Sequence, residues 1–205
     1  MNWKALPLAA LGVLLAAPQH LKATDAATVD APAPAFALTD QNGTPRSLGD
    51  FRGKVVVLEW VNFGCPFVRK HYDSGNMQKL QKEYTAKGVV WLSVISSAPG
   101  KQGYFEADEL KQRLATEKAV PTACLIDADG TVGKAYGAKT TPHMFVIDTK
   151  GVLAYAGAID DIASTDVDDV AKATNYVSAS LDAVMAGNEV PVKSTKPYGC
   201  GVKYQ

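Results

Sequence analysis

The chain has 205 residues, which is enough for one domain with a substantial hydrophobic core and hardly enough for two. Basic and acidic residues number 21 each, so the formal net charge is zero. This balance argues against nucleic acid or an anionic membrane surface as a binding partner.

The first 26 residues have the pattern of an export signal. Lys4 supplies a positive start, and residues 5–17 are apolar and uncharged. That stretch is too short to span a bilayer, which needs about 20 residues. We therefore predict a signal peptide over residues 1–26, no stable membrane insertion, and a periplasmic or secreted protein. The alternative is a disordered N-terminal arm.

The folded part is expected to begin at residue 36. Residues 27–35 hold two prolines among alanines and are predicted to be a flexible leader. Residues 36–48 are predicted to form a small hairpin that turns at Asn42-Gly43. A buried strand follows over residues 55–63, because this stretch is rich in β-branched and aromatic residues and lacks glycine and proline.

Cys65 lies where this strand gives way to a helix. Gly64 ends the strand, and Pro66 suits the first helical position because its missing N–H would have no partner there. Unpaired amide groups and the positive end of the helix dipole converge at such a junction and favour thiolate over thiol. We therefore expect Cys65 to be a reactive nucleophile held near the molecular surface.

The remaining elements alternate between helices and strands. In chain order we expect a helix over 66–87 with a break near 73–76, a strand over 89–95, a helix over about 107–118 capped near Ala107-Asp108, a strand over 122–126, one or two helical turns over 132–136, and a hairpin of residues 143–147 and 152–156. This order indicates an α/β protein with a mixed sheet.

One more helix is predicted after the hairpin. Apolar residues repeat at three- and four-residue steps from Val167 to Val184, so we expect a long helix from near Asp166 to Gly187. Prolines keep the tail over residues 188–205 extended.

Four motifs make the chain resemble the thioredoxin superfamily, and within it the redoxin group of alkyl hydroperoxide reductase and thiol-specific antioxidant proteins. They are Trp60-x-x-x-Gly64-Cys65-Pro66-Phe67, Asp127-x-x-Gly130 followed by Tyr136-Gly137-Ala138, Thr141-Pro142, and Thr195-Lys196-Pro197-x-Gly199-Cys200. The last motif is similar to that of a peroxiredoxin-like subfamily with a cysteine near its C-terminus.

The resemblance covers residues 36–205. It implies a thioredoxin-like fold, in which a central mixed sheet is flanked by helices. The single domain would cover residues 36–187, with an N-terminal hairpin and an extended C-terminal tail.

The resemblance also implies that Pro142 follows a cis peptide bond and that its loop faces Cys65. The backbone of Thr141 would then be available to an extended substrate. An ordinary trans proline at the start of a strand is the alternative.

The second thiol is not where a dithiol site has it, because Val68 stands at the second cysteine position of Cys-x-x-Cys. Cys200, on a tail between two glycines, is the candidate resolving cysteine. A static Cys65–Cys200 disulfide that ties the tail down is the alternative, and the sequence leaves both open. Cys124, in an apolar strand, is predicted to be a buried packing residue.

These features favour an exported thiol–disulfide oxidoreductase without a bound cofactor. Its partners would be a protein or small-molecule disulfide, or a hydroperoxide, and an external thiol reductant. Two alternatives stay open, namely a peroxiredoxin-like hydroperoxide reductase in the strict sense and a non-catalytic binding module of the same fold.

The strict peroxiredoxin pattern is incomplete. Leu58 and Asn62 stand where those enzymes have proline and threonine before the attacking cysteine. Asn62 and Arg69 are the weak substitutes available for binding the substrate. Arg113, the only later arginine, is expected on a helix away from the site.

Two histidines raise a metal alternative. Some proteins of this fold bind copper through cysteines and a distant histidine, which directs attention to His71 and His143. The usual partner cysteine is absent, however, and solvent-facing histidines are the ordinary explanation. We therefore predict no metal site.

Overall fold

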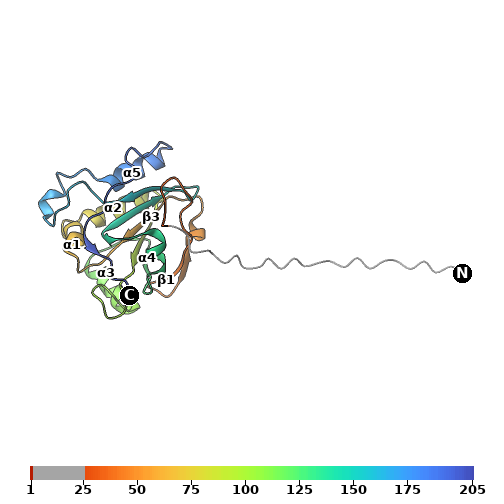
Figure 1. Ribbon diagram of the computed structural model, residues 1–205, viewed down its shortest axis with the longest axis horizontal. Coiled ribbons are helices and arrows are strands. Elements are labelled where there is room, and N and C mark those ends of the chain that lie inside the picture. The colour runs from red at the N-terminus through yellow and green to blue at the C-terminus, as the bar shows by residue number, and fades with distance from the viewer. Residues whose placement is uncertain (2–25) are drawn as a thin grey trace.

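The computed structural model describes residue 1 and residues 26–205 (Figure 1). The predicted export signal therefore lies almost wholly outside the described residues.

A seven-stranded mixed sheet forms the centre of the molecule, as predicted. In spatial order its strands are β2 (Pro45–Ser47), β1 (Ala37–Asp40), β5 (Ala123–Ile126), β4 (Val90–Ile95), β3 (Val56–Trp60), β7 (His143–Ile147) and β8 (Leu153–Gly157). The central strands β5, β4 and β3 are parallel, and the flanking strands are antiparallel. A second, two-stranded sheet pairs β6 (Thr140–Thr141) with β9 (Cys200–Gly201).

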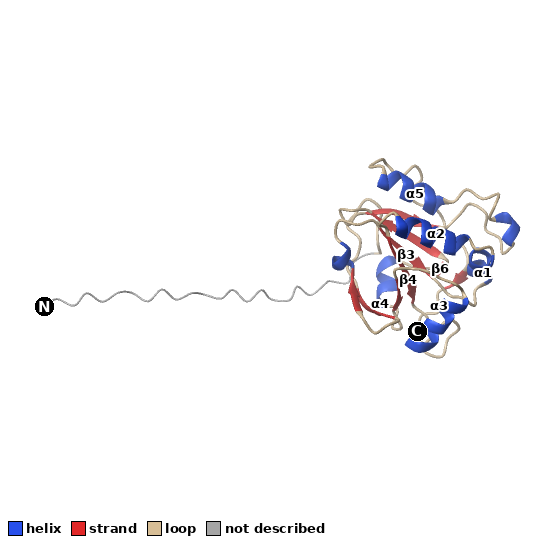
Figure 2. Cartoon of the chain, turned by 180° about the vertical axis from the view of Figure 1, so that it is seen from behind, coloured by secondary structure: helices blue, strands red, loops and turns tan. Residues whose placement is uncertain are grey.

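Helices cover both faces of the central sheet (Figure 2). Side chains of α1 (Pro66–Asp73), α2 (Asn76–Ala86), α3 (Ala107–Thr116) and α5 (Tyr176–Met185) join one buried cluster, and those of α4 (Thr131–Tyr136) join the other. Strands β3 and β4 are buried on both faces. This burial explains why their sequences are continuous apolar runs rather than alternating patterns.

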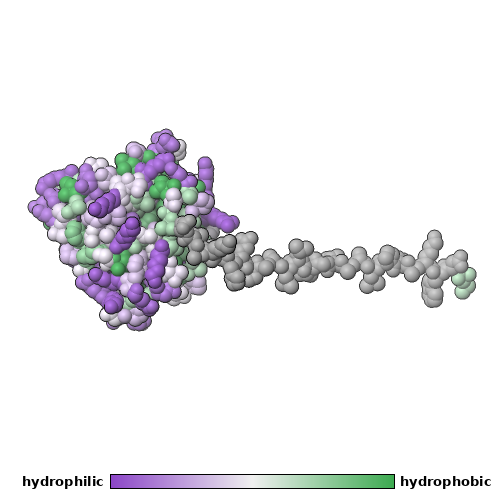
Figure 3. Space-filling model, viewed as in Figure 1, coloured by the Kyte–Doolittle hydropathy of each residue, from purple (hydrophilic) through white to green (hydrophobic). Residues whose placement is uncertain are grey.

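The molecular surface is mainly polar on the face in view. Hydrophilic side chains cover most of it, and hydrophobic ones are scattered (Figure 3). Val120, Val167, Met185 and Val192 are large apolar side chains that are exposed. No helix in the described part of the chain is long and apolar enough to cross a bilayer.

The predicted break in the helix after Cys65 is confirmed. Helix α1 ends at Asp73, and α2 begins at Asn76 after Gly75, which has a left-handed backbone with φ +74°. The cap of α3 differs by one residue from the prediction. Glu106 precedes the helix, and its N–H donates to the Glu109 carboxylate at 3.1 Å.

The long helix expected from Asp166 is wrong in its first turns. Asp166 accepts the N–H of Asp168 at 2.9 Å and caps only a short 3₁₀ turn, η2 (Val167–Asp169). Helix α5 starts at Tyr176, where Asn175 accepts the N–H of Ser178 at 2.9 Å. The apolar spacing was misleading because Val167 is 42% exposed, so burial does not support a helix there.

The leader and the tail were expected to be flexible and extended, and both are bound to the domain. In residues 27–35, the N–H of Asp30 donates to the Leu153 carbonyl at 2.8 Å, and that of Ala33 to Gly151 at 2.9 Å. The tail forms a parallel bridge to Ala156 at Ser194 and then the strand β9. The physical reason is that β8 is an edge strand. Its outer N–H and C=O groups form hydrogen bonds with the leader and with the start of the tail.

Candidate active site

Cys65 is the N-cap residue of α1, as the sequence pattern predicted. The N–H of Cys65 donates to the Asn62 carbonyl at 2.9 Å, which closes a turn after β3. The Cys65 carbonyl then accepts the N–H groups of Val68 and Arg69 at 3.0 and 2.9 Å, with Pro66 as the first helical residue. Local backbone bonds therefore set the position of this cysteine.

The expectation that the Cys65 sulfur lies near the surface is wrong, because the residue is 0% exposed. Its Sγ lies 2.6 Å from the Sγ of Cys200 and 3.1 Å from the carbonyl oxygen of Thr141. The Cys200 N–H also points at it, at 3.4 Å. Cys65 thus belongs to a buried hydrophobic cluster, and within it the sulfur contacts the Thr141 carbonyl and the thiol and N–H of Cys200 in β9.

The two sulfurs are closer than non-bonded sulfur atoms normally approach and farther apart than the ~2.05 Å of a covalent bond. Burial, followed by the interaction with Cys65, raises the pKa of the Cys200 thiol to about 11. Cys200 is therefore protonated at neutral pH.

The loop before β7 faces Cys65. The Thr141–Pro142 peptide bond is cis, in agreement with the sequence prediction. Thr141 is buried and pairs with Cys200 in the β6–β9 ladder. The backbone edge that was expected to be open to a substrate is thus occupied by the chain's own tail.

Asn62 and Arg69 are committed to structural contacts. The Asn62 amide accepts the N–H of Gly64 at 2.9 Å and donates to the Gln102 carbonyl at 3.2 Å. The Arg69 guanidinium pairs with Glu117 at 2.5 and 2.6 Å and also with Asp73. Neither side chain is among the hydrogen-bond partners of the two sulfurs, so their role in binding substrate stays a prediction.

Arg113 was expected to lie away from the site, and that expectation is wrong. Its Nη2 donates to the carbonyl of Phe63 at 3.2 Å, two residues before Cys65. Helix α3 therefore supports the loop that carries the cysteine.

Both histidines were expected to face solvent, and both are buried. His143 Nδ1 accepts the N–H of Lys139 at 3.3 Å, whereas His71 contacts Asn76 at 2.9 Å. Burial lowers the pKa of each imidazole to about 4. Within residues 26–205, no group of three or more His, Cys, Asp or Glu side chains is arranged to hold a metal ion.

Cys124 lies in β5 and is fully buried, as predicted. Burial raises the pKa of its thiol well above the ordinary value. It is therefore a packing residue and a natural control for Cys65.

Two buried polar groups were not predicted from the sequence. The first is Glu59 in β3, whose carboxyl group accepts hydrogen bonds from Trp91 at 2.8 Å and Ser93 at 3.0 Å. Burial raises its pKa. The sequence feature that could have predicted this buried carboxyl group is a single acidic residue within an apolar strand.

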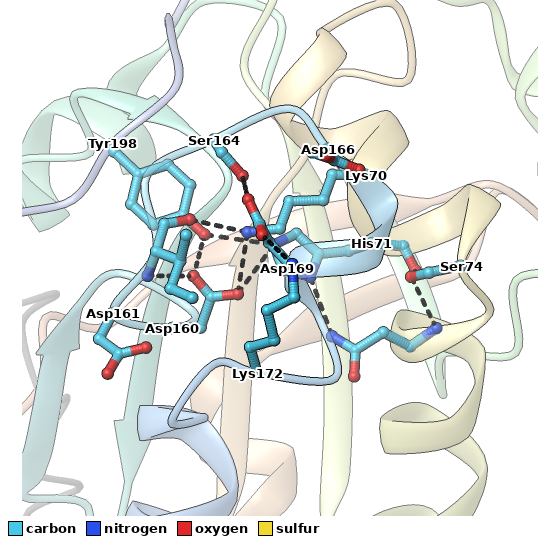
Figure 4. Close-up of polar contacts among 12 residues, drawn as sticks. Lys70, His71, Ser74, Asp160, Asp161, Ser164, Asp166, Asp169, Lys172 and Tyr198 are labelled. Atoms are coloured by element: carbon cyan, nitrogen blue, oxygen red, sulfur yellow. Dashed lines mark hydrogen bonds and ion pairs between the residues drawn. The ribbon is translucent and has the colours of Figure 1, made fainter.

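The second is a cluster of Lys70, His71 and Asp160 that receives Tyr198 of the tail (Figure 4). The Lys70 ammonium donates to Asp160 at 3.2 Å and to the Ile162 carbonyl at 2.7 Å. No local sequence pattern predicts this cluster, because its members come from α1, from the segment after β8 and from the tail.

The chain is similar in sequence to a thiol-disulfide oxidoreductase and to a thioredoxin-like protein. The chain is 30% identical over 146 residues to the thiol-disulfide oxidoreductase ResA of Geobacillus thermodenitrificans, a match that covers 71% of this chain and 78% of the relative. It is 31% identical over 121 residues to the thioredoxin-like protein YneN of Bacillus subtilis, covering 59% and 66%. The chain thus spans just under two thirds of the length of this Bacillus relative.

Solved structures share the fold. A hypothetical protein, SMc02350 from Sinorhizobium meliloti, has a TM-score of 0.73 at 25% identity, with 88% of this chain and 97% of that one covered. The thioredoxin domain of the oxidoreductase BVU-2223 from Bacteroides vulgatus has a TM-score of 0.51 at 21% identity, covering 71% and 96%. The Redoxin family profile matches residues 28–174, which include the mixed sheet, Cys65 and the cis-Pro loop. The chain therefore belongs to the Redoxin family and has a thioredoxin-like fold.

Proposed function

We propose that the protein is an exported thiol–disulfide oxidoreductase in which Cys65 is the attacking nucleophile and Cys200 the resolving cysteine. The observation that carries the proposal is the 2.6 Å approach of the two sulfurs at the start of α1. The name of the Geobacillus relative, a thiol-disulfide oxidoreductase, supports the reaction class. Export is supported by the charged and then apolar pattern of residues 1–26.

In the reductive direction, the Cys65 thiolate attacks one sulfur of a protein or small-molecule disulfide. The substrate S–S bond breaks, one substrate thiolate leaves and takes up a proton, and a mixed disulfide remains. Cys200 then loses its proton and attacks the Cys65 sulfur, so that the Cys65–Cys200 bond forms and the second substrate thiol leaves. Two electrons have passed to the substrate, and an external dithiol must reduce the protein again.

The protonation of Cys200 supports this division of roles. While the tail covers Cys65, burial raises the pKa of Cys200 to about 11, so the Cys200 thiol stays protonated in the resting protein. Its place directly beside Cys65 suits the second attack, in which proximity replaces a collision between molecules.

A hydroperoxide is the less favoured substrate. Peroxide cleavage needs groups that polarise the O–O bond beside the sulfur, and the two side chains expected to do so are otherwise engaged. Asn62 holds Gly64, and Arg69 is paired with Glu117.

Replacing Cys65 with serine tests the proposal. We expect reduction of insulin disulfides by dithiothreitol to lose its catalysed component, a decrease of at least about a thousandfold. The matched control is Cys124→Ala, which removes an equally buried thiol and should retain the activity. An unchanged rate in Cys65→Ser would reject the proposal.

Mass spectrometry of the protein treated with oxidised glutathione tests the cycle. A Cys65–Cys200 disulfide that forms in glutathione and is opened by dithiothreitol supports cycling. A bridge that resists dithiothreitol in the folded protein supports the non-catalytic alternative.

A further inference from the structure

The C-terminal tail lies over Cys65 as a strand. Cys200 pairs with Thr141 and Gly201 with Thr140 in antiparallel register. Cys65 is 0% exposed beneath this strand. A substrate disulfide can therefore reach Cys65 only when the strand leaves, and its departure frees the backbone edge that the strand occupies.

The residue before the tail cysteine must be small. Gly199 has φ +133°, a conformation that favours glycine, and a Cβ built on it would overlap the carbonyl oxygen of Thr141. A strand that binds this edge as the tail does therefore has glycine immediately before its cysteine.

Tyr198, two positions before the cysteine, lies in a pocket that contacts both its ring and its hydroxyl group. The Tyr198 ring packs edge-on against Phe67, with ring centroids 5.8 Å apart, and the Lys70 ammonium lies 5.7 Å from the ring centre. Its hydroxyl donates to Asp160 and contacts His71 Nε2 at 3.3 Å (Figure 4).

This pocket does not depend on the tail for its charges. Lys70 and His71 are fully buried, and Asp160 is 3% exposed. Lys70 donates to the Asp160 carboxylate at 3.2 Å, a contact that does not involve the tail. A phenol hydroxyl from another chain would meet the same acceptor.

We propose that the tail occupies the substrate site and has the sequence that the site recognises. The protein then acts on extended peptide segments with the sequence tyrosine, glycine, cysteine. This inference rests on the proposed function, because the partner reacts with Cys65. The peptide pairs with Thr140 and Thr141 in place of the tail. Cys65 attacks the peptide cysteine in its disulfide, the Cys65–peptide S–S bond forms, and the other sulfur leaves with the electron pair and takes up a proton.

The test uses three full-length variants. Cys200→Ser keeps the tail in place without its thiol, and Gly199→Ala/Cys200→Ser forces the tail off the edge. The probe is the peptide Lys-Pro-Tyr-Gly-Cys-Gly-Val, with its cysteine joined by a disulfide to thionitrobenzoate. Attack by Cys65 releases the coloured thiol, and free cysteine measures the intrinsic reactivity of each probe.

We expect the tail-displaced variant to react about tenfold faster with this peptide than with peptides in which alanine replaces the tyrosine or the glycine. The Cys200→Ser variant, still covered, should react about tenfold more slowly than the displaced one with the same peptide. Tyr198→Ala/Cys200→Ser provides a second displaced variant and should show the same preference.

Equal rates for the three peptides in both displaced variants would overturn the inference. Displaced variants that react no faster than Cys200→Ser would overturn it as well. In either case, reaction with the mixed disulfide of glutathione and thionitrobenzoate would leave the proposed function standing. If Cys65 reacts with no disulfide, the proposed function itself is wrong.

Discussion

The two cysteines that meet at the site are held in different ways. Cys65 is positioned by its neighbours in sequence, through backbone bonds to Asn62, Val68 and Arg69. Cys200 lies 135 positions away and is positioned by β6 and by the anchor of Tyr198 on Asp160. The difference teaches that half of the site forms with α1, whereas the other half exists only in the completed fold.

Outside α1, the largest expected effect comes from removing the distant half of the site. In Cys200→Ser, the mixed disulfide between Cys65 and the substrate has no internal thiol to resolve it. We expect steady-state disulfide reduction to fall about a hundredfold, because an intermolecular thiol must replace a neighbouring one. Mass spectrometry should detect the trapped mixed disulfide. Full turnover would mean that external thiols resolve it and that Cys200 is dispensable.

The next effect concerns the charges that hold the tail. Lys70→Met leaves the buried Asp160 without its ammonium partner, so we expect a loss of about 3 kcal/mol in the free energy of unfolding. Adding Asp160→Asn to this variant should restore part of that loss, since it removes the unpaired charge. Urea titration measures both. Losses that simply add would show that the two groups do not interact.

A pH dependence of stability is also expected. Burial lowers the pKa of His71 and His143 to about 4 in the folded protein, from an ordinary 6.5. The free energy of unfolding is therefore highest above pH 6.5 and decreases as the pH falls towards 4. In that range the unfolded chain binds protons at these histidines and the folded chain does not. The loss amounts to up to about 3 kcal/mol for each histidine.

Urea titrations at pH 7 and pH 5 check this dependence. His143→Gln should reduce this dependence without abolishing it, because His71 still titrates, whereas replacing an exposed residue such as Lys150→Gln should leave it unchanged. An equal decline in the His143→Gln variant would contradict the assignment.

The smallest effect tests a single helix cap. Asn175→Ala removes the cap of α5 and should destabilise the protein by about 1 kcal/mol. Asp166→Ala, at the helix start that the apolar spacing suggested, should cost only a few tenths of that cap energy. A larger loss of stability in Asp166→Ala than in Asn175→Ala would support the longer helix predicted from the sequence. Thermal unfolding separates the two.

Much of the fold followed from local signals. Continuous apolar runs gave the central strands, Gly75 marked the break between α1 and α2, and Pro66 marked the start of α1. The Thr141-Pro142 pair, read together with Cys65, predicted the loop that faces the sulfur. The strands, the break and the helix start depend on a few consecutive residues, whereas the loop that faces Cys65 from 76 positions away was implied by the family resemblance.

The failures share a cause. The two histidines were expected in solvent and Arg113 away from the site, yet their burial and contacts come from other elements. The leader over residues 27–35 was expected to be flexible because it holds two prolines among alanines. Its partner is the edge of β8, which a linear reading does not bring near.

The amino-acid order alone determined that a cysteine would stand at the N-terminus of a helix and that a second cysteine would follow on a tail. That a Thr-Pro loop would face the first cysteine was implied by the resemblance to the thioredoxin superfamily. Only the tertiary structure decided that the tail returns as a strand over Cys65, since His71 and Tyr198 are 127 positions apart. The physical reason is the range of the interactions. Turns, caps and strand propensities act between near neighbours, whereas edge pairing and a buried charge cluster join segments that only the folded chain brings together.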